Sequence, residues 1–402
     1  MRKLLIMRGA PGVGKSTLIK KHNMEHYTLA SDTFRMILQS PVLTLDGSFG
    51  VSQSYGREDA WHLLYVALEK RMQNGDFVIV DATHSKLSDM LTYKALADKY
   101  RYKIVVVDFT SIPLEVALKR NREREEYKRI PEAHIEKCFM RFKSQRIPAD
   151  MDVVDYEHFD DVLTLQPIDY SFYKKVHHIG DIHGSYQVLM EYLKDGIKDD
   201  ELYIFLGDYI DRGLENAKVL SFLLSIRHKQ NVVLLEGNHE KYLWNWANNE
   251  TARSSVFETQ TRIELEKNQI SRKEVQCFCR GLKEAVYYRY EGKEVLVTHG
   301  GLPSFPSNLN WVSADQLIKG VGDYQTQIDE FFDKNEQNTL HYQIHGHRNF
   351  FLKPTNAYQH SFNLEGAVER GGELRSAVLT KEGFSFVSLK NTVYKPVEEK
   401  AI

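Results

Sequence analysis

The first part of the chain alternates continuous apolar runs with segments of helical spacing. The apolar runs predict buried strands at Leu4–Arg8, Phe77–Asp81 and Lys103–Phe109. Apolar side chains three and four positions apart predict helices over residues 15–22, 59–73, 87–100 and 113–124. Strands and helices in this order are typical of a parallel sheet with helices on both faces.

In the second part of the chain, four predicted strands each end in polar residues. The strands Lys175–Ile179, Leu202–Leu206, Val232–Leu235 and Glu294–Val297 lead into GDIHG, GDYIDRG, GNHE and THGG. Loops at strand ends are where sheets present catalytic groups. Residues 357–389 alternate apolar and polar side chains, which predicts antiparallel strands.

A domain boundary is expected between residues 150 and 173, where the periodicity fades and Pro148 and Pro167 occur. A chain of 402 residues, 42% hydrophobic and 27% charged, can bury two or three cores. We therefore predict an α/β chain with one domain over residues 1–165 and a second over 173–395. No apolar run approaches the roughly 18–20 residues that span a membrane.

The charge of the chain is close to neutral but is unevenly distributed. The net charge is −2, which argues against bulk adhesion to nucleic acid. Residues 1–150 carry a balance of +7 and the remainder −9, which suits an anionic substrate in the first part and cations in the second. Cys138, Cys277 and Cys279 are too few for a disulfide framework, and a reducing cytoplasm fits them.

A phosphate-binding loop occupies Gly9–Ser16, which matches G-x-x-x-x-G-K-S after a strand and before a helix. Backbone amides of such a loop surround phosphate oxygens, and the helix adds its positive end. Lys15 is expected to neutralise nucleotide charge and Ser16 to hold Mg²⁺. The predicted ATP contacts are Gly9, Gly12, Gly14, Lys15, Ser16 and Thr17.

Further charged residues in this part favour transfer to an acceptor over simple ATP hydrolysis. Asp32 and Arg35 are three apart and face the same way if they begin a helix, so Asp32 can serve as a general base. Asp81 ends a buried strand, as a Walker B acid does. Arg120 and Arg124 are expected to cover the phosphates as a lid, whereas we interpret Arg122 as a solvated surface charge.

Residues 1–145 resemble the 5′-polynucleotide kinase family of phage and bacterial RNA repair enzymes. The resemblance depends on GAPGVGKST, SDTFR, VDATH and the lid Arg120-Asn121-Arg122-Glu123-Arg124. It implies that Asp32 is the base for a 5′-hydroxyl, that Arg35 contacts the substrate phosphate or supports the base, and that Arg120 and Arg124 grip ATP. His84 stands where family members often have Asn.

The polar loops of the second part make a set of nitrogen and oxygen ligands. Asp181 and His183 point to the same side of an extended segment, and Asp208 and Asn238 follow. His299 and one of His345 and His347 complete the set, which suits Mn²⁺, Fe, Ni²⁺ or Zn²⁺ better than Ca²⁺. Two ions held by a bridging carboxylate would clamp a phosphate for hydrolysis.

Residues 173–390 resemble the calcineurin-like metallophosphatases, most closely their protein-phosphatase and polynucleotide-phosphatase branches. The resemblance implies a β-sandwich flanked by helices. It implies ligands Asp181, His183 and Asp208 for one metal, and Asp208, Asn238, His299 and His347 for the other. It also implies His239 as proton donor oriented by Asp211, Arg212 on phosphate oxygens, and Glu365 of FNLEG in cyclic phosphodiester cleavage.

Both resemblances in this order indicate a bifunctional kinase-phosphatase of the bacterial polynucleotide end-healing family. Such an enzyme would phosphorylate 5′-hydroxyl ends with ATP and Mg²⁺ and remove 2′,3′-cyclic, 2′- or 3′-phosphates with two Mn²⁺ or similar ions. RNA ends are the favoured partner. Because no K-x-D-G motif occurs, a separate ligase is expected downstream. A homodimer is one option among the oligomeric states left open.

Two alternatives remain at the level of sequence. The second part also carries the motifs of protein Ser/Thr phosphatases, so the chain could be a signalling enzyme fused to a nucleotide-binding regulatory domain. The phosphate-binding loop could also serve as a nucleotide sensor. Neither alternative gives a role to Asp32, Arg35 or the arginine lid.

Overall fold

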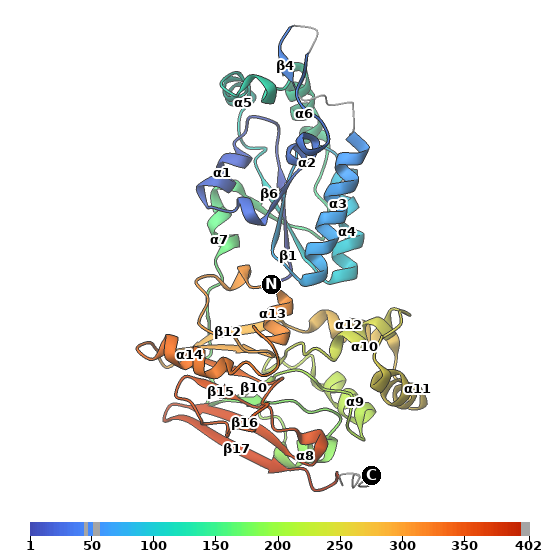
Figure 1. Ribbon diagram of the computed structural model, residues 1–402, viewed down its shortest axis with the longest axis vertical. Coiled ribbons are helices and arrows are strands. Elements are labelled where there is room, and N and C mark those ends of the chain that lie inside the picture. The colour runs from blue at the N-terminus through green and yellow to red at the C-terminus, as the bar shows by residue number, and fades with distance from the viewer. Residues whose placement is uncertain (44–46, 51–56, 395–402) are drawn as a thin grey trace. The chain divides into compact units, whose positions relative to one another are not determined.

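The computed structural model describes residues 1–43, 47–50 and 57–394, which form two compact units (Figure 1). The first unit comprises Met1–Leu165 together with Asn308–Ala314, and the second comprises the rest of the described chain. Residue 395, the expected end of the second domain, lies outside the described residues. Each unit has its own hydrophobic core and is described by itself.

The first unit is built on a parallel sheet in the order β2-β5-β1-β6-β7, in which β1, β5 and β6 are the three strands that the apolar runs predicted and β2 and β7 were not predicted. The strands are β1 (Lys3–Arg8), β2 (Thr28–Ala30), β5 (Val78–Asp81), β6 (Lys103–Asp108) and β7 (Asp152–Asp155). A short hairpin of β3 (Val42–Leu43) and β4 (Phe49–Gly50) lies apart from this sheet.

Alternate residues of β1 face two separate cores, one on each side of the sheet. Leu5 and Met7 pack with α1 (Lys15–Lys21), α5 (Leu114–Arg122), α6 (Glu132–Ser144) and α7 (Phe159–Leu163). Leu4 and Ile6 pack with α3 (Arg57–Asn74) and α4 (Leu87–Tyr100). The strand is apolar on both faces because both faces are covered, which confirms the predicted doubly covered sheet.

The sheet order brings three loops to one edge. Met7 of β1 and Ala30 of β2 both pair with Asp81 of β5. The phosphate-binding loop follows β1, and α2 (Ser31–Leu38) follows β2. Parallel strands all end at the same edge, so Asp81 lies between the loop and the start of α2.

The segment Asn308–Ala314 packs with the first unit although it lies within the range expected for the second domain. The amino group of Met1 donates to the carbonyl of Val312 at 2.5 Å, and Asn310 donates to that of Leu163 at 2.8 Å. Trp311 stacks on Tyr27 with ring centroids 5.8 Å apart. These contacts join residues far apart in sequence, and no local pattern signals them.

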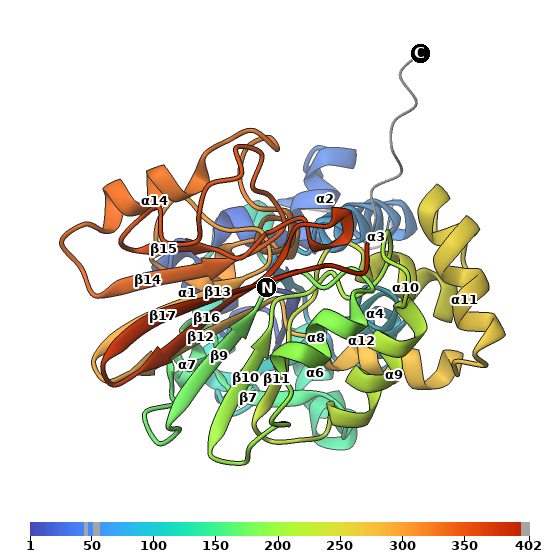
Figure 2. The ribbon, with the colours of Figure 1, turned by 90° about the horizontal axis from the view of Figure 1, so that it is seen from below.

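The second unit is a sandwich of two five-stranded sheets, as the resemblance implied (Figure 2). One sheet has the order β11-β10-β9-β16-β17 and the other β15-β14-β13-β12-β8. The strands of the first are β9 (Lys175–Ile179), β10 (Glu201–Phe205), β11 (Val232–Leu234), β16 (Glu373–Thr380) and β17 (Gly383–Lys390). Those of the second are β8 (Ile168–Asp169), β12 (Ala285–Tyr290), β13 (Lys293–Thr298), β14 (His341–His345) and β15 (Ser361–Asn363).

Apolar side chains of both sheets meet in a core that includes Ile204, Val297 and Ile344. A second core packs helices against the other face of the first sheet, with Leu220 and Leu243 among its members. Its helices are α8 (Tyr186–Tyr192), α9 (Asn216–Ile226), α10 (Glu240–Ala247), α11 (Arg262–Lys267) and α12 (Arg272–Gly281). The remaining helices are α13 (Ala314–Lys319) and α14 (Ile328–Glu336). Among the described residues, every helix is too short or too polar to cross a bilayer.

The prediction of antiparallel strands over residues 357–389 is correct for one pair and wrong for one strand. β16 and β17 pair antiparallel across the short turn between them. β15 instead pairs parallel to β14. The long connection between these two strands lets the chain return to the start of the sheet, and parallel neighbours require such a crossover.

Candidate functional sites

The phosphate-binding loop is preformed in the first unit. Gly12 and Gly14 adopt φ values of +88° and +105°, and a Cβ at Gly12 would lie 2.3 Å from the carbonyl oxygen of Ala117. Lys15 begins α1, and its buried amine donates to the carbonyls of Gly9 at 2.8 Å and Ala10 at 3.1 Å. Burial lowers the pKa of Lys15, while Asp81 and Asp32 act to raise it.

Ser16 and Asp81 form the expected pair for a hydrated metal ion. The Ser16 hydroxyl donates to Oδ2 of Asp81 at 2.7 Å. Burial raises the pKa of Asp81, with Lys15 and Ser16 opposing. An exposed hydroxyl beside a buried carboxylate fits Mg²⁺, which takes oxygen ligands beside nucleotide phosphates.

Asp32 and Arg35 lie together in the first turns of α2, as their spacing predicted. Nη1 of Arg35 is 3.1 Å from Oδ1 of Asp32. The side chain of Asp32 is 65% exposed and lines the same cavity as Lys15 and Ser16. A carboxylate that is held by an arginine and open to a cavity is suited to accept a proton from a bound hydroxyl.

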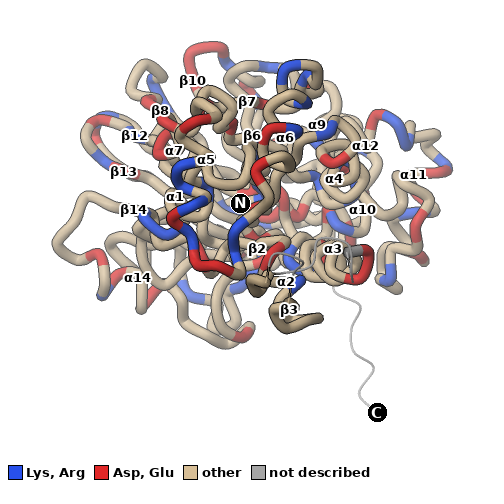
Figure 3. The backbone as a smooth tube through the Cα atoms, turned by 90° about the horizontal axis from the view of Figure 1, so that it is seen from above, with Lys and Arg blue, Asp and Glu red and all other residues tan. Residues whose placement is uncertain are grey.

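The arginines of the predicted lid differ in where they point. Nη1 of Arg120 donates to the carbonyl of Val13 in the phosphate-binding loop at 2.9 Å, and Arg124 lines the cavity. Arg122 instead pairs with Glu132 at 2.6 Å, with its side chain 67% exposed. The last turns of both α1 and α5 carry basic residues (Figure 3). The geometry therefore separates Arg120 and Arg124 from Arg122.

The cavity has further lining residues that the sequence interpretation left without a role. They are Trp61, Tyr65, Lys128, Lys137 and Arg141. Lys128, Lys137 and Arg141 lie in the segment 119–146, which is rich in Lys and Arg, and this composition is a signal for them. His84 also lines the cavity, but both ring nitrogens are engaged, with the carbonyl of Met7 at 2.7 Å and the hydroxyl of Tyr93 at 3.0 Å. Burial lowers the pKa of His84 to about 4.

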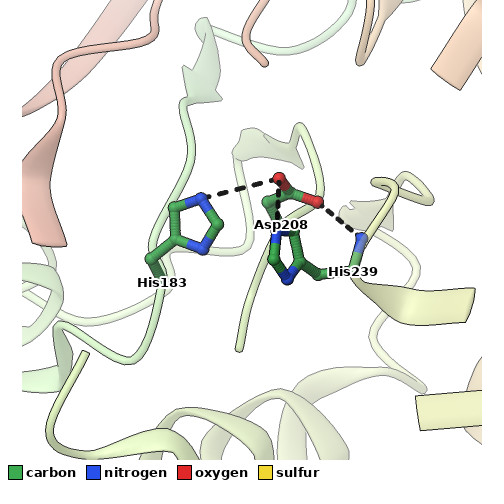
Figure 4. Close-up of side chains that lie close together, drawn as sticks. All are labelled: His183, Asp208 and His239. Atoms are coloured by element: carbon green, nitrogen blue, oxygen red, sulfur yellow. Dashed lines mark hydrogen bonds and ion pairs between the residues drawn. The ribbon is translucent and has the colours of Figure 1, made fainter. Parts of the chain in front are cut away.

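In the second unit, the polar loops converge on Asp208 (Figure 4). Its Oδ2 lies 3.5 Å from Nε2 of His183, 3.3 Å from Nε2 of His299 and 4.0 Å from Nε2 of His239. Three groups each place their ligand atoms within 4.8 Å of one another: His183, Asp208 and His239; Asp208, His299 and His347; and Asp181, His183 and Glu365. Asp208 thus occupies the position of a shared ligand.

The hydrogen bonds of the cluster fit metal ions. Nδ1 of His183 donates to the carbonyl of Ile210 at 3.0 Å, and Nδ1 of His299 to that of Leu206 at 2.9 Å. Each carbonyl can only accept, so these bonds fix the ring orientation and leave Nε2 facing Asp208, as in metal-binding histidines. Oδ1 of Asn238 is 3.3 Å from Nε2 of His299.

The buried carboxylates of the cluster also favour the binding of cations. Burial raises the pKa of Asp181 well above its ordinary value, and the carboxylates of Glu365 and Asp208 add to the effect. Burial also acts to raise the pKa of Asp208, but His299 and His239 outweigh it and hold that pKa well below its usual range. Buried carboxylates this close to one another are stabilised by a divalent ion.

The backbone of these loops is held in a sparsely populated conformation. His183, Asp208, Asp211, Arg212 and His347 all have positive φ, between 41° and 74°. Each such residue costs roughly 1–3 kcal/mol and persists only where the surroundings enforce it. The residue after Arg212 must be glycine, because a Cβ at Gly213 would lie 1.8 Å from the carbonyl oxygen of His183.

His239 and Arg212 border the cluster with different partners. Nδ1 of His239 is 2.6 Å from Oδ2 of Asp211, and the hydroxyl of Thr261 donates to Oδ1 of the same carboxylate. Burial acts to lower the pKa of His239, but Asp208 and Asp211 raise it overall, which favours the protonated ring. Nη1 of Arg212 is 3.3 Å from Nε2 of His183 and 3.4 Å from Oε1 of Glu369.

The structure distinguishes the two histidines that sequence left open. His347 lies in the cluster, and its amide donates to Oδ2 of Asp181 at 3.1 Å. His345 is turned away, with Nε2 2.8 Å from Oδ1 of Asp329. Burial lowers the pKa of His347 to about 3, which keeps the ring neutral and able to bind a metal.

One supporting residue escaped the sequence interpretation. The buried carboxylate of Glu240 accepts the amides of Asp208 at 2.9 Å, Tyr209 at 3.0 Å and Gly237 at 2.7 Å. It thereby fixes the loops that carry Asp208 and Asn238. The signal was present, because Glu240 is the last residue of the GNHE motif.

Two family models match the chain, one in each part. Residues 4–146 match the model of an AAA domain, and residues 174–374 match that of the calcineurin-like phosphoesterases. Among solved structures, the chain is similar to a putative diadenosine tetraphosphatase, with 16% identity, a TM-score of 0.40, and coverage of 57% of this chain and 96% of that one.

Two further solved structures resemble the chain to a similar degree. A protein serine/threonine phosphatase from Saccharomyces cerevisiae has 16% identity and a TM-score of 0.41, covering 63% of this chain and 93% of that one. A cold-active protein-tyrosine phosphatase of a psychrophilic Shewanella has 18% identity and a TM-score of 0.36, covering 57% and 84%. The range matched by the calcineurin-like phosphoesterase model, residues 174–374, spans half of the present chain. The chain therefore belongs to the calcineurin-like phosphoesterase family, and an AAA domain precedes the matched range.

Proposed function

We propose that this chain heals nucleic-acid ends, and RNA ends in particular. One unit would phosphorylate a 5′-hydroxyl with ATP, and the other would remove a 2′,3′-cyclic, 2′- or 3′-phosphate. The observation that carries the proposal is the composition of the first cavity, where Asp32 and Arg35 line the same space as Lys15, Arg120 and Arg124. A nucleotide sensor has no use for a base and its arginine partner beside the phosphates.

In the kinase reaction, the carboxylate of Asp32 would accept the proton of the 5′-hydroxyl as its oxygen attacks the γ-phosphorus of ATP, and ADP would leave. Arg35 orients the carboxylate by their contact of 3.1 Å. Lys15, Arg120 and Arg124 would stabilise the charge that spreads over the phosphoryl oxygens. Ser16 and Asp81 are suited to hold Mg²⁺.

In the phosphatase reaction, Arg212 would bind phosphate oxygens, and His239, oriented by Asp211 at 2.6 Å, would give its proton to the ribose oxygen as the bond from that oxygen to phosphorus breaks. The residues that would hold two Mn²⁺ or similar ions are Asp181, His183, Asp208, Asn238, His299 and His347. When bound, such ions polarise the phosphate and generate the nucleophile. We also propose that a separate ligase seals the healed ends in a reducing cytoplasm.

An RNA with a 5′-hydroxyl and a 2′,3′-cyclic phosphate tests the proposal. It is incubated with the protein, ATP, Mg²⁺ and Mn²⁺, and the mass of each terminus is followed. We expect the 5′ end to gain a phosphate and the cyclic phosphate to be lost. An unchanged 5′ end together with hydrolysis of phosphopeptides would contradict end healing and support the signalling alternative.

Two variants separate the two reactions. Asp32→Ala should abolish ATP-dependent 5′ labelling and leave removal of the 3′ phosphate intact. His239→Ala should slow phosphate removal by roughly 100-fold or more and leave 5′ labelling intact. If Asp32→Ala keeps its labelling activity, Asp32 is not the base.

A further inference from the structure

Three exposed aromatic rings lead away from the metal cluster of the second unit. The side chains of Tyr324, Phe350 and Phe351 are 53%, 52% and 53% exposed. Tyr324 lies edge-on to His347, with centroids 6.0 Å apart, and to Phe350 at 6.4 Å. Phe351 continues the row, 5.1 Å from Phe350. We call these three residues the aromatic platform.

The turn that carries Tyr324 is held in place by hydrogen bonds from a buried arginine. The buried guanidinium of Arg348, which follows His347 directly, donates to the carbonyls of Val321 at 2.8 Å and Gly322 at 3.5 Å, and to that of Asp323. The carboxylate of Asp323 in turn accepts the amide of Gln325 at 3.0 Å. The backbone on both sides of Tyr324 is therefore fixed while its ring stays half exposed.

The turn that carries Phe350 and Phe351 is braced in the same way. The side-chain amide of Asn349 donates to the carbonyls of Lys353 at 2.8 Å and Glu365 at 3.1 Å, and its oxygen accepts the amide of Lys353 at 2.9 Å. Large apolar rings held open to water by ordered turns cost free energy unless a ligand covers them. Because the three rings lie beside the metal cluster, we expect the ligand that covers them to carry the phosphate that binds at the cluster.

Charged groups at the cluster complete the setting. Nη1 of Arg212 lies 3.3 Å from Nε2 of His183 and 3.4 Å from the carboxylate of Glu369, which Arg370 also contacts at 3.6 Å. The side chains of Arg212 and Arg370 are 41% and 74% exposed. A phosphate bound at the cluster would thus have two arginines and an aromatic ring within its surroundings.

We propose that the aromatic platform stacks the nucleobases of a polynucleotide end whose terminal phosphate lies at the metal cluster, with the terminal base on Tyr324. This inference rests on the proposed function and names how the phosphatase site recognises its substrate. Aromatic rings interleaved with cations bind single strands in this way, and stacking tolerates every base because each has an open face. The platform makes polynucleotide ends better substrates than small phosphate esters.

The test compares three substrates that share the scissile phosphate. They are an oligonucleotide with a 3′-phosphate, the same oligonucleotide with an abasic terminal nucleotide, and glycerol 2-phosphate. For the intact oligonucleotide, Tyr324→Ala should raise KM roughly tenfold while kcat stays within about twofold. KM for the abasic oligonucleotide and for glycerol 2-phosphate should not change. Tyr324→Phe keeps the ring and should restore the intact substrate's KM.

Phe172→Ala is the matched control, because Phe172 is also an exposed ring but packs on Tyr170 and Tyr173 beside β8. It should change none of the three KM values. An equal loss on all three substrates in Tyr324→Ala would assign the ring a structural role and overturn the proposal, as would an unchanged KM for the intact oligonucleotide.

The outcome for wild-type protein keeps the two proposals distinct. If it hydrolyses the intact and abasic oligonucleotides with equal KM, the platform proposal fails while end healing stands. If it hydrolyses glycerol 2-phosphate and a phosphoserine peptide but neither oligonucleotide, end healing fails. A rise in KM for the peptide in Tyr324→Ala would then assign the platform to protein substrates and overturn its role with bases.

Discussion

The two sites of this chain bind phosphates by opposite means. In the first unit, the charges stand on separate elements around an open cavity, and Asp32 is 65% exposed. In the second, the key carboxylates and imidazoles are buried and tied to backbone groups, and Asp208 is 1% exposed. The open arrangement suits the proposed binding of a nucleotide and an acceptor, whereas the residues of the metal site are held in place by their own hydrogen bonds.

The difference extends to the backbone. The phosphate-binding loop places positive φ at glycines such as Gly12 and Gly14, where it costs little. The metal loops place it at residues with functional side chains, including His183, Asp208 and Arg212. The second site therefore carries more strain, which its hydrogen bonds must offset. Substitution of the shared metal ligand should accordingly have a larger effect than substitution of an arginine of the lid.

The largest effect is expected at the shared ligand. Asp208→Asn removes the negative charge that three histidines surround, so phosphatase activity should fall at least about 1000-fold. Calorimetric titration should show that Mn²⁺ binding is lost or greatly weakened, and 5′ labelling should persist. Asp315→Asn, at an exposed carboxylate paired with Lys319, is the control and should retain both. Full phosphatase activity in Asp208→Asn would remove it from the metal site.

A smaller effect is expected from the arginine lid. Arg124→Ala should lower the kinase kcat by roughly 100-fold, because a cation that stabilises the transferring phosphoryl group is lost. Arg122→Ala, two residues away and paired with Glu132, should change kcat by less than about twofold. Steady-state 5′ labelling measures both. Equal losses of kcat in the two variants would contradict a specific role for Arg124 at the transferring phosphoryl group.

Sequence predicted the parts of both sites that local pattern encodes. Lys15 and Ser16 follow from one loop, and Asp181 and His183 from one extended segment. The sequence pattern left open whether His345 or His347 is the metal ligand. His345 is excluded by its contact with Asp329, whose Oδ1 lies 2.8 Å from Nε2 of His345. Contacts between residues distant along the chain decide such cases, and periodicity does not record them.

The same reason explains the errors in the fold. The three central strands of the first sheet were predicted from continuous apolar runs, since both of their faces are covered, whereas the half-exposed edge strands β2 and β7 were not predicted. The parallel pairing of β15 depends on a crossover, and the packing of Asn308–Ala314 depends on Met1 and Tyr27. His84 could not be read as a support because its partners, Met7 and Tyr93, lie on two other elements.

A third prediction concerns the support of Arg212. Glu369 is buried and contacts Arg212 at 3.4 Å, so Glu369→Gln should loosen the arginine and raise the phosphatase KM by about three- to tenfold, with a smaller change in kcat. A kcat that falls without a change in KM would contradict a role in binding. Glu373→Gln is the control, because the carboxylate of Glu373 pairs with Arg375 and not with Arg212.

The last prediction concerns the stability of the sandwich, which no catalytic measurement reports, and it depends on pH. His178 is fully buried between the two sheets, with Nδ1 2.9 Å from the carbonyl of Ala377 and Nε2 2.8 Å from the hydroxyl of Tyr288. Its Nδ1 therefore donates and its Nε2 accepts. Burial lowers its pKa from 6.5 to about 3. The unfolded chain consequently binds a proton more readily than the folded one.

The sign of the effect follows from this order of pKa values. The stability that neutral His178 contributes is complete above pH 6.5 and is lost progressively as the pH falls toward 3, at about 1.4 kcal/mol per unit. Urea unfolding of the second unit, followed by hydrogen exchange in β16, should show a shallower loss between pH 6 and 4 in His178→Gln than in wild type. His228→Gln, at an exposed histidine after α9, should keep the wild-type slope. An unchanged slope in His178→Gln would mean that other buried groups dominate the acid response, and the metal cluster would be the first to test.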